Sequence, residues 1–198
     1  KPALIVDTKK IPGIIGITER DGGFVIGAAT SGAMLGEHAG LLAAYPGVVE
    51  AANLIGSTQV QGRASLAGNL CNASPAADSV PAMIAAGAIA VIAGPNGRRS
   101  VKVEQVCIAP GRTSLAKDEF IVEFHLPKPA ARSADAYLRF IPRTEMDIAV
   151  VGAGVCMTLD AGGAITAARV ALGAVAPTAL LVADCTTAII GSRLDEHA

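Results

Sequence analysis

The sequence predicts a mixed α+β fold, and three observations support this expectation. Apolar residues make up 52% of the 198-residue chain. They are mostly Ala, Val, Ile and Leu, whose small side chains let helices and sheets pack in close layers. Short β-branched runs with glycine-containing turns occur near both ends of the chain. Between them lie segments with apolar residues three and four positions apart, which indicate helices.

The expected strands are short apolar runs, and turns join several of them into hairpins. Asp21-Gly22 between two apolar runs is a strong hairpin signal, and residues 94–97 and 160–163 form further turns of this kind. Polar and apolar residues alternate over 119–126, which predicts a half-buried strand. The expected strands are residues 3–7, 14–19, 24–30, 89–93, 98–103, 119–126, 136–141, 149–159 and 164–172.

The expected helices are marked by apolar spacing and by residues that start helices. Tyr45-Pro46-Gly47 interrupts one long helical pattern. Ser74-Pro75 has the form of an N-cap followed by the first helical residue, and Asp78-Ser79 has the form of a second helix start. The expected helices are residues 33–44, 48–54, 80–86 and 178–190.

Charge and cysteine usage exclude several classes of protein. The net charge is −1 with both signs interspersed, so no nucleic-acid surface is expected. No apolar run is long enough to span a membrane, and no signal peptide is expected, because Lys1-Pro2 is followed by a short strand-like stretch. The four cysteines have no metal-ligand spacing, so no metal site is expected, and they predict buried free thiols in the cytoplasm. The cysteines are Cys71, Cys107, Cys156 and Cys185.

Residues 63–78, RASLAGNLCNASPAAD, contain almost no side chain that can act as a catalytic acid, base or nucleophile, and no catalytic residue is assigned. A phosphate-bearing ligand needs exposed backbone N–H groups, small side chains and additional hydroxyl or amide groups, all of which this segment offers. Asp78 would repel a phosphate, and it suits a ribose hydroxyl or a ring N–H better. The alternative is an ordinary loop that caps a helix, since neither GxGxxG nor GxxxxGK[ST] occurs.

This segment resembles the second flavin-binding motif of the molybdenum hydroxylase flavoprotein subunits, T-[IL]-G-G-N followed by ASPxxD. That family includes the medium subunit of carbon monoxide dehydrogenase and the flavin domain of xanthine dehydrogenase. The resemblance covers essentially the whole chain, because further stretches follow in the family's order. These are VDTKKIPGI, IGAATSGAML, EFIVEFHLPKP, YLRFIPRTEMDIAVVGAGV and LGAVAPTAL.

The resemblance implies a vanillyl-alcohol-oxidase-type fold divided near the linker-like residues 127–133. Residues 1–130 would be the second FAD-binding subdomain. Residues 131–198 would begin a C-terminal domain with a three-stranded antiparallel sheet and a helix. The chain would be an oxidoreductase subunit that passes electrons through FAD to an external acceptor. Its partners would be a small subunit with 2Fe-2S clusters and a large subunit with the molybdenum cofactor.

The resemblance also implies a set of FAD-binding residues. Ser65, Gly68 and Asn69 would lie beside the phosphates, while Ser74 and Asp78 would lie toward the ribityl and ribose hydroxyls. The full set is Ala64, Ser65, Gly68, Asn69, Asn72, Ser74, Asp78, Ile121 and Arg139.

Two members of this set would act at the isoalloxazine ring. Ile121 would place backbone groups at the ring edge, and Arg139 would place a positive charge near N1 and the C2 carbonyl. The alternative for Arg139 is a surface salt bridge with Glu145. Residues 143–147 are expected to form a charged loop near the flavin, and the alternative is that they form a solvated turn. His125 is expected to be structural, and His197 lies near the end of the chain.

Two departures from the family pattern bear on FAD binding. The family's first flavin motif would lie before Lys1, so the chain is expected to be a piece of a longer polypeptide with weak or absent FAD binding. Ser65 replaces the usual Thr, and Ala67 replaces a Gly, which requires a negative φ at Ala67. The alternatives are a scaffold of the same fold that binds no flavin and a stand-alone flavin reductase.

Overall fold

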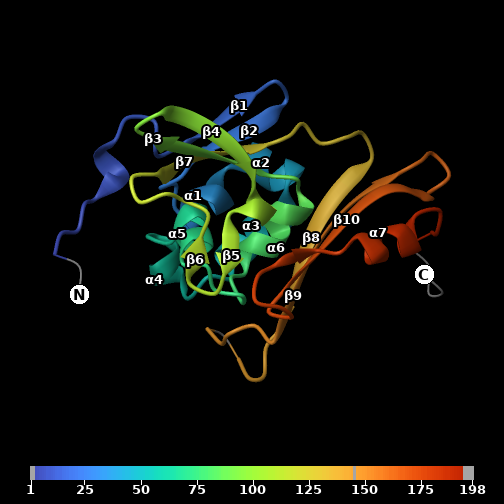
Figure 1. The fold of residues 1–198 in the computed structure, drawn as a ribbon. Helices are drawn as coiled ribbons and strands as arrows, with labels where there is room; N and C mark the ends of the chain where they lie inside the picture. The colour runs from blue at the N-terminus through green and yellow to red at the C-terminus, as the bar shows by residue number, and fades with distance from the viewer. Residues whose placement is uncertain (1–2, 145, 194–198) are drawn as a thin grey trace.

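The computed structural model describes residues 3–144 and 146–193, which form a layer of helices between two antiparallel sheets (Figure 1). The strands are β1 (Ile17–Arg20), β2 (Gly23–Gly27), β3 (Ile89–Gly94), β4 (Gly97–Lys102), β5 (Cys107–Ala109), β6 (Arg112–Thr113), β7 (Phe120–Leu126), β8 (Ser133–Phe140), β9 (Val151–Leu159), β10 (Ile165–Gly173) and β11 (Leu180–Leu181). The α-helices are α1 (Gly32–Glu37), α2 (Ala39–Ala44), α3 (Pro46–Asn53), α4 (Thr58–Gln61), α5 (Leu66–Cys71), α6 (Ser79–Ala85) and α7 (Ala183–Ile189), and the 3-10 helices are η1 (Thr8–Lys10) and η2 (Val103–Gln105).

The larger sheet has the strand order β1-β2-β7-β3-β4, and the second has the order β11-β10-β9-β8. Asp21 and Gly22 adopt φ values of 55° and 78° at the β1–β2 turn, and these left-handed values suit a two-residue hairpin. Gly94 pairs with Gly97 at the β3–β4 turn. The β1–β2, β3–β4 and β9–β10 hairpins are therefore confirmed. Strand β7 lies at the centre of its sheet with alternating burial, which confirms the half-buried strand over 119–126.

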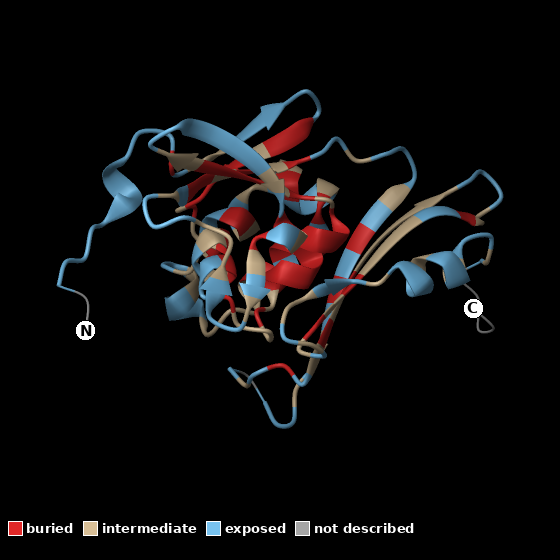
Figure 2. Cartoon of the chain, in the orientation of Figure 1, coloured by how far each residue is buried: buried red, intermediate tan, exposed pale blue. Residues whose placement is uncertain are grey.

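One hydrophobic core joins the three layers. Ile26 and Phe124 contribute to it from the five-stranded sheet, Leu41 and Met83 from the helices, and Tyr137 from the second sheet. Figure 2 shows these buried segments gathered along the inner helices and the strand faces that meet them. The segments before and after residue 130 therefore share a single apolar interior.

A buried carboxylate on β8 holds the start of α3. Oδ1 of Asp135 accepts a hydrogen bond from the Gly47 N–H at 3.1 Å, and Oδ2 accepts one from the Val48 N–H at 3.0 Å. These groups lack intrahelical partners, so Asp135 acts as an N-cap from another strand. A Cβ on Gly47 would lie 2.7 Å from the backbone of Ala136, and only glycine permits this approach.

Three local predictions are wrong. Residues 3–7 form no strand, and their apolar side chains are exposed. The predicted helix at 33–44 is broken at His38, whose Nδ1 accepts a hydrogen bond from the Leu41 N–H at 3.0 Å and caps α2. The predicted helix at 178–190 begins only at Ala183, because Leu180–Leu181 pairs with β10 and makes the second sheet four-stranded.

The cysteine prediction needs correction as well. All four thiols are free, but Cys71 and Cys185 are exposed and Cys107 and Cys156 are half-buried, so none is a fully buried core residue. Within the described ranges, no cluster of three or more His, Cys, Asp or Glu side chains could hold a metal ion. No helix in those ranges is long and apolar enough to cross a membrane.

Candidate functional site

Helix α5 organises the segment that the sequence singled out. The Ser65 hydroxyl oxygen accepts a hydrogen bond from the Gly68 N–H at 3.2 Å and caps the helix. Leu66 and Leu70, one helical turn apart, are buried and anchor it to the core. Because Ala67 lies inside α5, its φ is negative, as the substitution of glycine by alanine requires.

The polar positions of this segment share the opposite face of α5. Positions 65, 68, 69 and 72 follow the i, i+3, i+4, i+7 spacing of one helix face. All four line a groove that runs along α5. Sequence analysis did not predict α5, although Ser65 followed three residues later by a small residue is compatible with a helix start.

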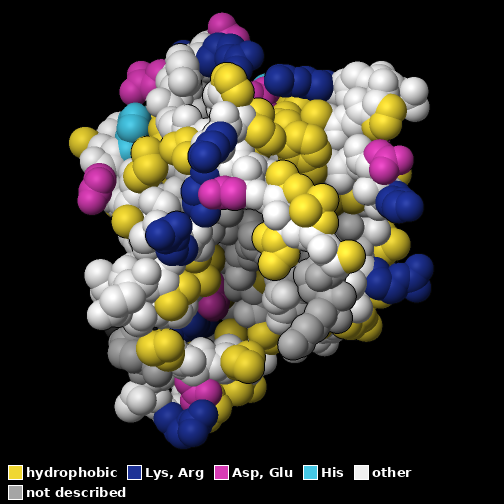
Figure 3. All heavy atoms as spheres, turned by 90° about the vertical axis from the view of Figure 1, so that its left-hand side faces the viewer, with side chains coloured by type: hydrophobic (Ala, Val, Ile, Leu, Met, Phe, Trp, Pro, Cys, Tyr) yellow, Lys and Arg dark blue, Asp and Glu magenta, His cyan; other side chains and the backbone are white. Residues whose placement is uncertain are grey.

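The groove consists of three adjacent hollows that share lining residues, and we name them the apolar, middle and polar hollows. Their volumes are about 270, 370 and 280 Å³, respectively. The apolar and middle hollows share Arg63, Ser65 and Gly68. The middle and polar hollows share Ile55, Asn69 and Asn72. Figure 3 faces the side of the molecule with the N-terminal segment, where the surface is hollowed near its centre.

The apolar hollow lies where the start of β7 meets the segment before β1. Ile121 is 4% exposed and forms part of its wall, while the neighbouring Phe120 is 40% exposed. Ile14, Ala28 and Ala29 complete the wall from the first hairpin. This hollow therefore offers a largely apolar lining next to the capped start of α5.

The polar hollow contains a buried group of three hydrogen-bonded side chains, which we name the Asp78 triad. Oδ1 of Asp78 accepts a hydrogen bond from the Tyr137 hydroxyl at 2.9 Å. Oδ2 of Asp78 accepts one from Nη1 of Arg139 at 3.0 Å, and the same nitrogen donates to the Leu54 carbonyl at 3.2 Å. Tyr137 is 1% exposed, and the side chains of Asp78 and Arg139 are 12% and 7% exposed.

Burial sets the electrostatics of the triad. Desolvation raises the pKa of Asp78, and the hydrogen bonds from Tyr137 and Arg139 oppose that shift. Burial also raises the pKa of Tyr137, and the neighbouring Asp78 charge adds to this effect. Tyr137 is therefore a hydrogen-bond donor at neutral pH, and the carboxylate of Asp78 is its acceptor.

The alternation of β8 explains how the triad forms. Residues two positions apart on a strand point to the same face, so Tyr137 and Arg139 both reach toward Asp78 at the start of α6. Sequence analysis missed Tyr137, although the strand expected at 136–141 places residues 137 and 139 on the same face. The ion pair of Arg139 is internal, in contrast to the surface salt bridge considered from sequence. Glu145, the partner proposed there, lies outside the described residues.

Asn69 connects the groove to the start of α6. Its Oδ1 accepts hydrogen bonds from the Ser79 N–H at 3.2 Å and from the Ser79 hydroxyl at 2.7 Å. The carboxamide oxygen is thus used inside the protein, and the amide nitrogen is the group that can serve a ligand. Ser74 does not start a helix as predicted: its hydroxyl oxygen accepts a hydrogen bond from the Ala76 N–H, but the following residues form only a turn and the helix begins at Ser79.

The structure brings all nine residues expected from the resemblance to this groove, but at different positions along it. Ile121 lines the apolar hollow and Arg139 the polar hollow, so the two residues assigned to the isoalloxazine ring lie in separate hollows. Ala64 lines the middle hollow, and its carbonyl accepts a hydrogen bond from the Gly32 N–H at 2.9 Å. Lys9, Arg63 and Phe120 also line the groove and were not predicted.

The charged loop at 143–147 lies partly at the groove. Asp147 lines the polar hollow and forms an exposed ion pair with Arg143, with 2.9 Å between its Oδ1 and Nη2 of Arg143. His125 lies outside the groove, and its Nε2 is 2.9 Å from Oε1 of Glu123 on the same strand, which fits a structural role. His197 lies outside the described residues.

Comparison with known proteins gives two matches to families along the chain. Residues 1–129 match the FAD binding domain in molybdopterin dehydrogenase, and residues 136–198 match the CO dehydrogenase flavoprotein C-terminal domain. The chain is 34% identical over 176 residues to the xanthine dehydrogenase FAD-binding subunit of Escherichia coli O157:H7, covering 88% of this chain and 60% of that subunit.

Similarity to carbon monoxide dehydrogenase extends over the whole chain. It is 32% identical over 198 residues to the medium chain of the enzyme from Hydrogenophaga pseudoflava, covering 100% of this chain and 68% of the relative. A solved structure of carbon monoxide dehydrogenase from that organism matches with a TM-score of 0.88 at 34% identity, covering 96% of this chain and 65% of the other. The chain thus spans roughly two thirds of the relatives it matches, or somewhat less.

Proposed function

Because this chain belongs to the family of FAD-binding domains in molybdopterin dehydrogenase, we propose that it is the flavin-binding part of a molybdenum hydroxylase complex. In this proposal, electrons released at a molybdenum cofactor on a large subunit pass through 2Fe-2S clusters on a small subunit. They reach FAD on this chain and leave to an external acceptor. The free state of all four cysteines supports a reducing compartment such as the cytoplasm.

The row of adjacent hollows along α5 is the observation that carries the proposal. FAD is long and carries negative charge at its pyrophosphate, so it needs an extended site with small side chains and hydrogen-bond donors. A Cβ built on Gly68 would meet only the Ser65 hydroxyl oxygen, at 3.4 Å, so open space lies in front of this backbone. The three adjacent hollows and the donors around them therefore fit the cofactor.

The residues of the groove have distinct proposed roles toward FAD. Ser65, Gly68 and the amide nitrogen of Asn69 lie beside the middle of the cofactor, and Ile121 provides an apolar wall for a ring. Asp78 is held by Tyr137 and Arg139 with lone pairs left to accept a hydrogen bond from a hydroxyl or ring N–H. When bound, FAD supplies the redox chemistry, while these residues bind it, orient it and set its electrostatic surroundings.

The visible absorption spectrum of the purified protein tests this proposal. A flavoprotein shows absorption bands at about 370 and 450 nm, which are properties of the cofactor itself. Because this chain alone is expected to bind FAD weakly or not at all, the spectrum is measured on the longer polypeptide of which it is expected to be a piece. We expect these bands in that polypeptide after incubation with FAD and removal of the unbound cofactor. If the bands are absent, flavin binding is contradicted and the scaffold alternative is favoured.

Purification from the native cell tests the assignment to a complex. Larger subunits that contain molybdenum and iron should co-purify with the protein at a fixed ratio, and metal analysis of the purified fraction measures this. A yellow protein that purifies alone, without either metal, would contradict the complex and favour a stand-alone flavin reductase.

A further inference from the structure

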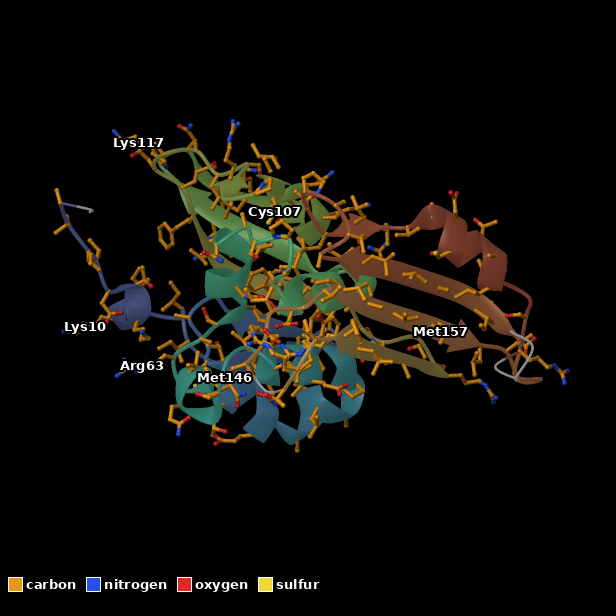
Figure 4. The ribbon with its side chains drawn as sticks, turned by 90° about the horizontal axis from the view of Figure 1, so that it is seen from below. Lys10, Arg63, Cys107, Lys117, Met146 and Met157 are labelled. Carbon is orange, nitrogen blue, oxygen red and sulfur yellow. The ribbon has the colours of Figure 1, made fainter. Side chains whose placement is uncertain are left out.

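Two cationic side chains from segments far apart in the sequence line the same part of the groove. Lys9, on η1, and Arg63, between α4 and α5, both line the apolar hollow, and Arg63 also lines the middle hollow. Figure 4 shows Arg63 and Lys10, the neighbour of Lys9, at the same end of the molecule, with η1 beside the segment that leads into α5. The fold therefore places positive charge at the junction of two hollows.

The other charged residues that line the groove are paired. Arg139 is bonded to Asp78 at 3.0 Å, and Asp147 is bonded to Arg143 at 2.9 Å. Lys9 approaches only Asp7, at 4.0 Å, and both side chains are substantially exposed. None of the ion pairs within residues 3–144 and 146–193 includes Arg63. Its positive charge is therefore available to a ligand.

The position of Arg63 along the groove indicates which part of FAD it meets. The pyrophosphate lies in the middle of the dinucleotide, with a ring-bearing half on each side. Arg63 likewise lines both of two neighbouring hollows. It lies close in sequence to Ser65, which caps α5, and to Gly68, whose backbone faces open space. A guanidinium group binds two phosphate oxygens at once through parallel N–H donors.

We propose that Arg63 binds the FAD pyrophosphate, with Lys9 supplying a second positive charge at the apolar hollow. The inference rests on the proposed function, because it requires FAD in the groove. The inference adds Arg63, which precedes α5, to the residues that bind the pyrophosphate. Arg63 would bind through a charged side chain, whereas Ser65, Gly68 and Asn69 would bind through backbone groups and short side chains.

Comparison of two flavins tests the inference in the full-length polypeptide. Riboflavin lacks the pyrophosphate and the adenosine of FAD, so the quenching of flavin fluorescence during titration separates contacts to that half of the cofactor from contacts to the isoalloxazine ring and ribityl chain, and the dependence on charge and salt then separates pyrophosphate from adenosine. We expect Arg63→Gln to weaken FAD binding roughly tenfold, the scale of one charge-assisted contact, and to leave riboflavin binding unchanged. Lys9→Gln should act in the same direction with a smaller loss.

Matched variants and ionic strength sharpen the test. Arg63→Lys keeps the charge and should recover part of the FAD affinity, while Arg112→Gln removes an exposed arginine outside the groove and should change neither flavin. Added salt should narrow the difference between wild type and Arg63→Gln, because it screens an exposed charge.

Three results would overturn the inference. The first is unchanged FAD affinity in Arg63→Gln, and the second is an equal loss for FAD and riboflavin, which would assign Arg63 to folding or to the ring. The third is a wild-type full-length polypeptide that binds neither flavin, and this result alone would overturn the proposed function as well.

Discussion

The two ends of the groove differ in how their charged side chains are neutralised. At the polar end, the charges of Asp78 and Arg139 neutralise each other beneath the surface, and Tyr137 completes the hydrogen bonding. At the apolar end, most of the lining side chains are apolar, Lys9 approaches only the exposed Asp7 at 4.0 Å, and none of the ion pairs in the described residues includes Arg63. The charged groups at the polar end are therefore neutralised and hydrogen-bonded within the protein. The cations at the apolar end present positive charge that an anionic ligand can neutralise.

This difference separates residues that mainly stabilise the fold from residues that mainly bind FAD. A buried ion pair that loses one partner leaves a desolvated charge, which costs far more than a lost surface pair. Substitution at the polar end should therefore change stability first and FAD affinity second. Substitution at the apolar end should change FAD affinity and leave stability nearly unchanged.

The largest effect is expected from Asp78→Ala. It leaves the buried Arg139 guanidinium without its carboxylate and the Tyr137 hydroxyl without its acceptor. We expect the free energy of unfolding to fall by about 3–5 kcal/mol, measured by urea denaturation followed by circular dichroism.

Asp147→Ala is the matched control, because it removes an aspartate from the same hollow whose arginine partner is exposed. Its effect on the free energy of unfolding should be much smaller. Equal losses for the two variants would show that the triad does not behave as a buried network and would remove the contrast between the two ends.

A smaller effect is expected at Asn69, which lies between the two ends. Asn69→Ala removes the acceptor of both Ser79 donors as well as the free amide. We expect losses of about 1–3 kcal/mol in FAD binding and of similar size in the free energy of unfolding. Flavin fluorescence and urea denaturation measure the two losses separately.

Asn69→Asp separates the two functions of this side chain. The carboxylate keeps an oxygen acceptor for Ser79 and is a good residue near a helix start, so stability should be retained. It lacks the amide donor and adds negative charge beside an anionic cofactor, so FAD binding should weaken. Retained FAD affinity in Asn69→Asp would contradict a contact between the amide nitrogen and the cofactor.

The smallest effect is expected at Cys71, which lines the apolar hollow. Burial of the thiol, with a further contribution from Cys107, raises its pKa to about 11, although the residue as a whole is exposed. Because the thiolate is the reactive form, alkylation by iodoacetamide should be slow at pH 7 and should accelerate as pH rises toward 11. Peptide mass spectrometry measures the rate at each pH.

Bound FAD should slow the alkylation of Cys71, because the cofactor would cover the hollow. Cys185 on α7 lies outside the groove and serves as the control, since its rate should not respond to FAD. Protection of both cysteines to the same extent, or of neither, would contradict FAD binding in the apolar hollow.

Much of the local structure follows from short-range patterns. The Asp21-Gly22 turn requires left-handed backbone that these residues tolerate, and the alternation over 119–126 gives a strand with one buried face. The small and polar residues at 63–78 likewise indicated a surface that a ligand can approach closely. These features depend on neighbours within a few positions, so the sequence alone determined them.

Only the tertiary structure decided which distant side chains meet. Tyr137 and Arg139 bond to Asp78 across separations of 59 and 61 residues, and this requires β8 to lie against the helix layer. The same packing decided that Leu180–Leu181 pairs with β10 instead of starting a helix. It also brought Lys9 and Arg63 to the lining of the same hollow. Local patterns set the direction of a side chain along its own element, whereas the partner it reaches depends on how the elements pack.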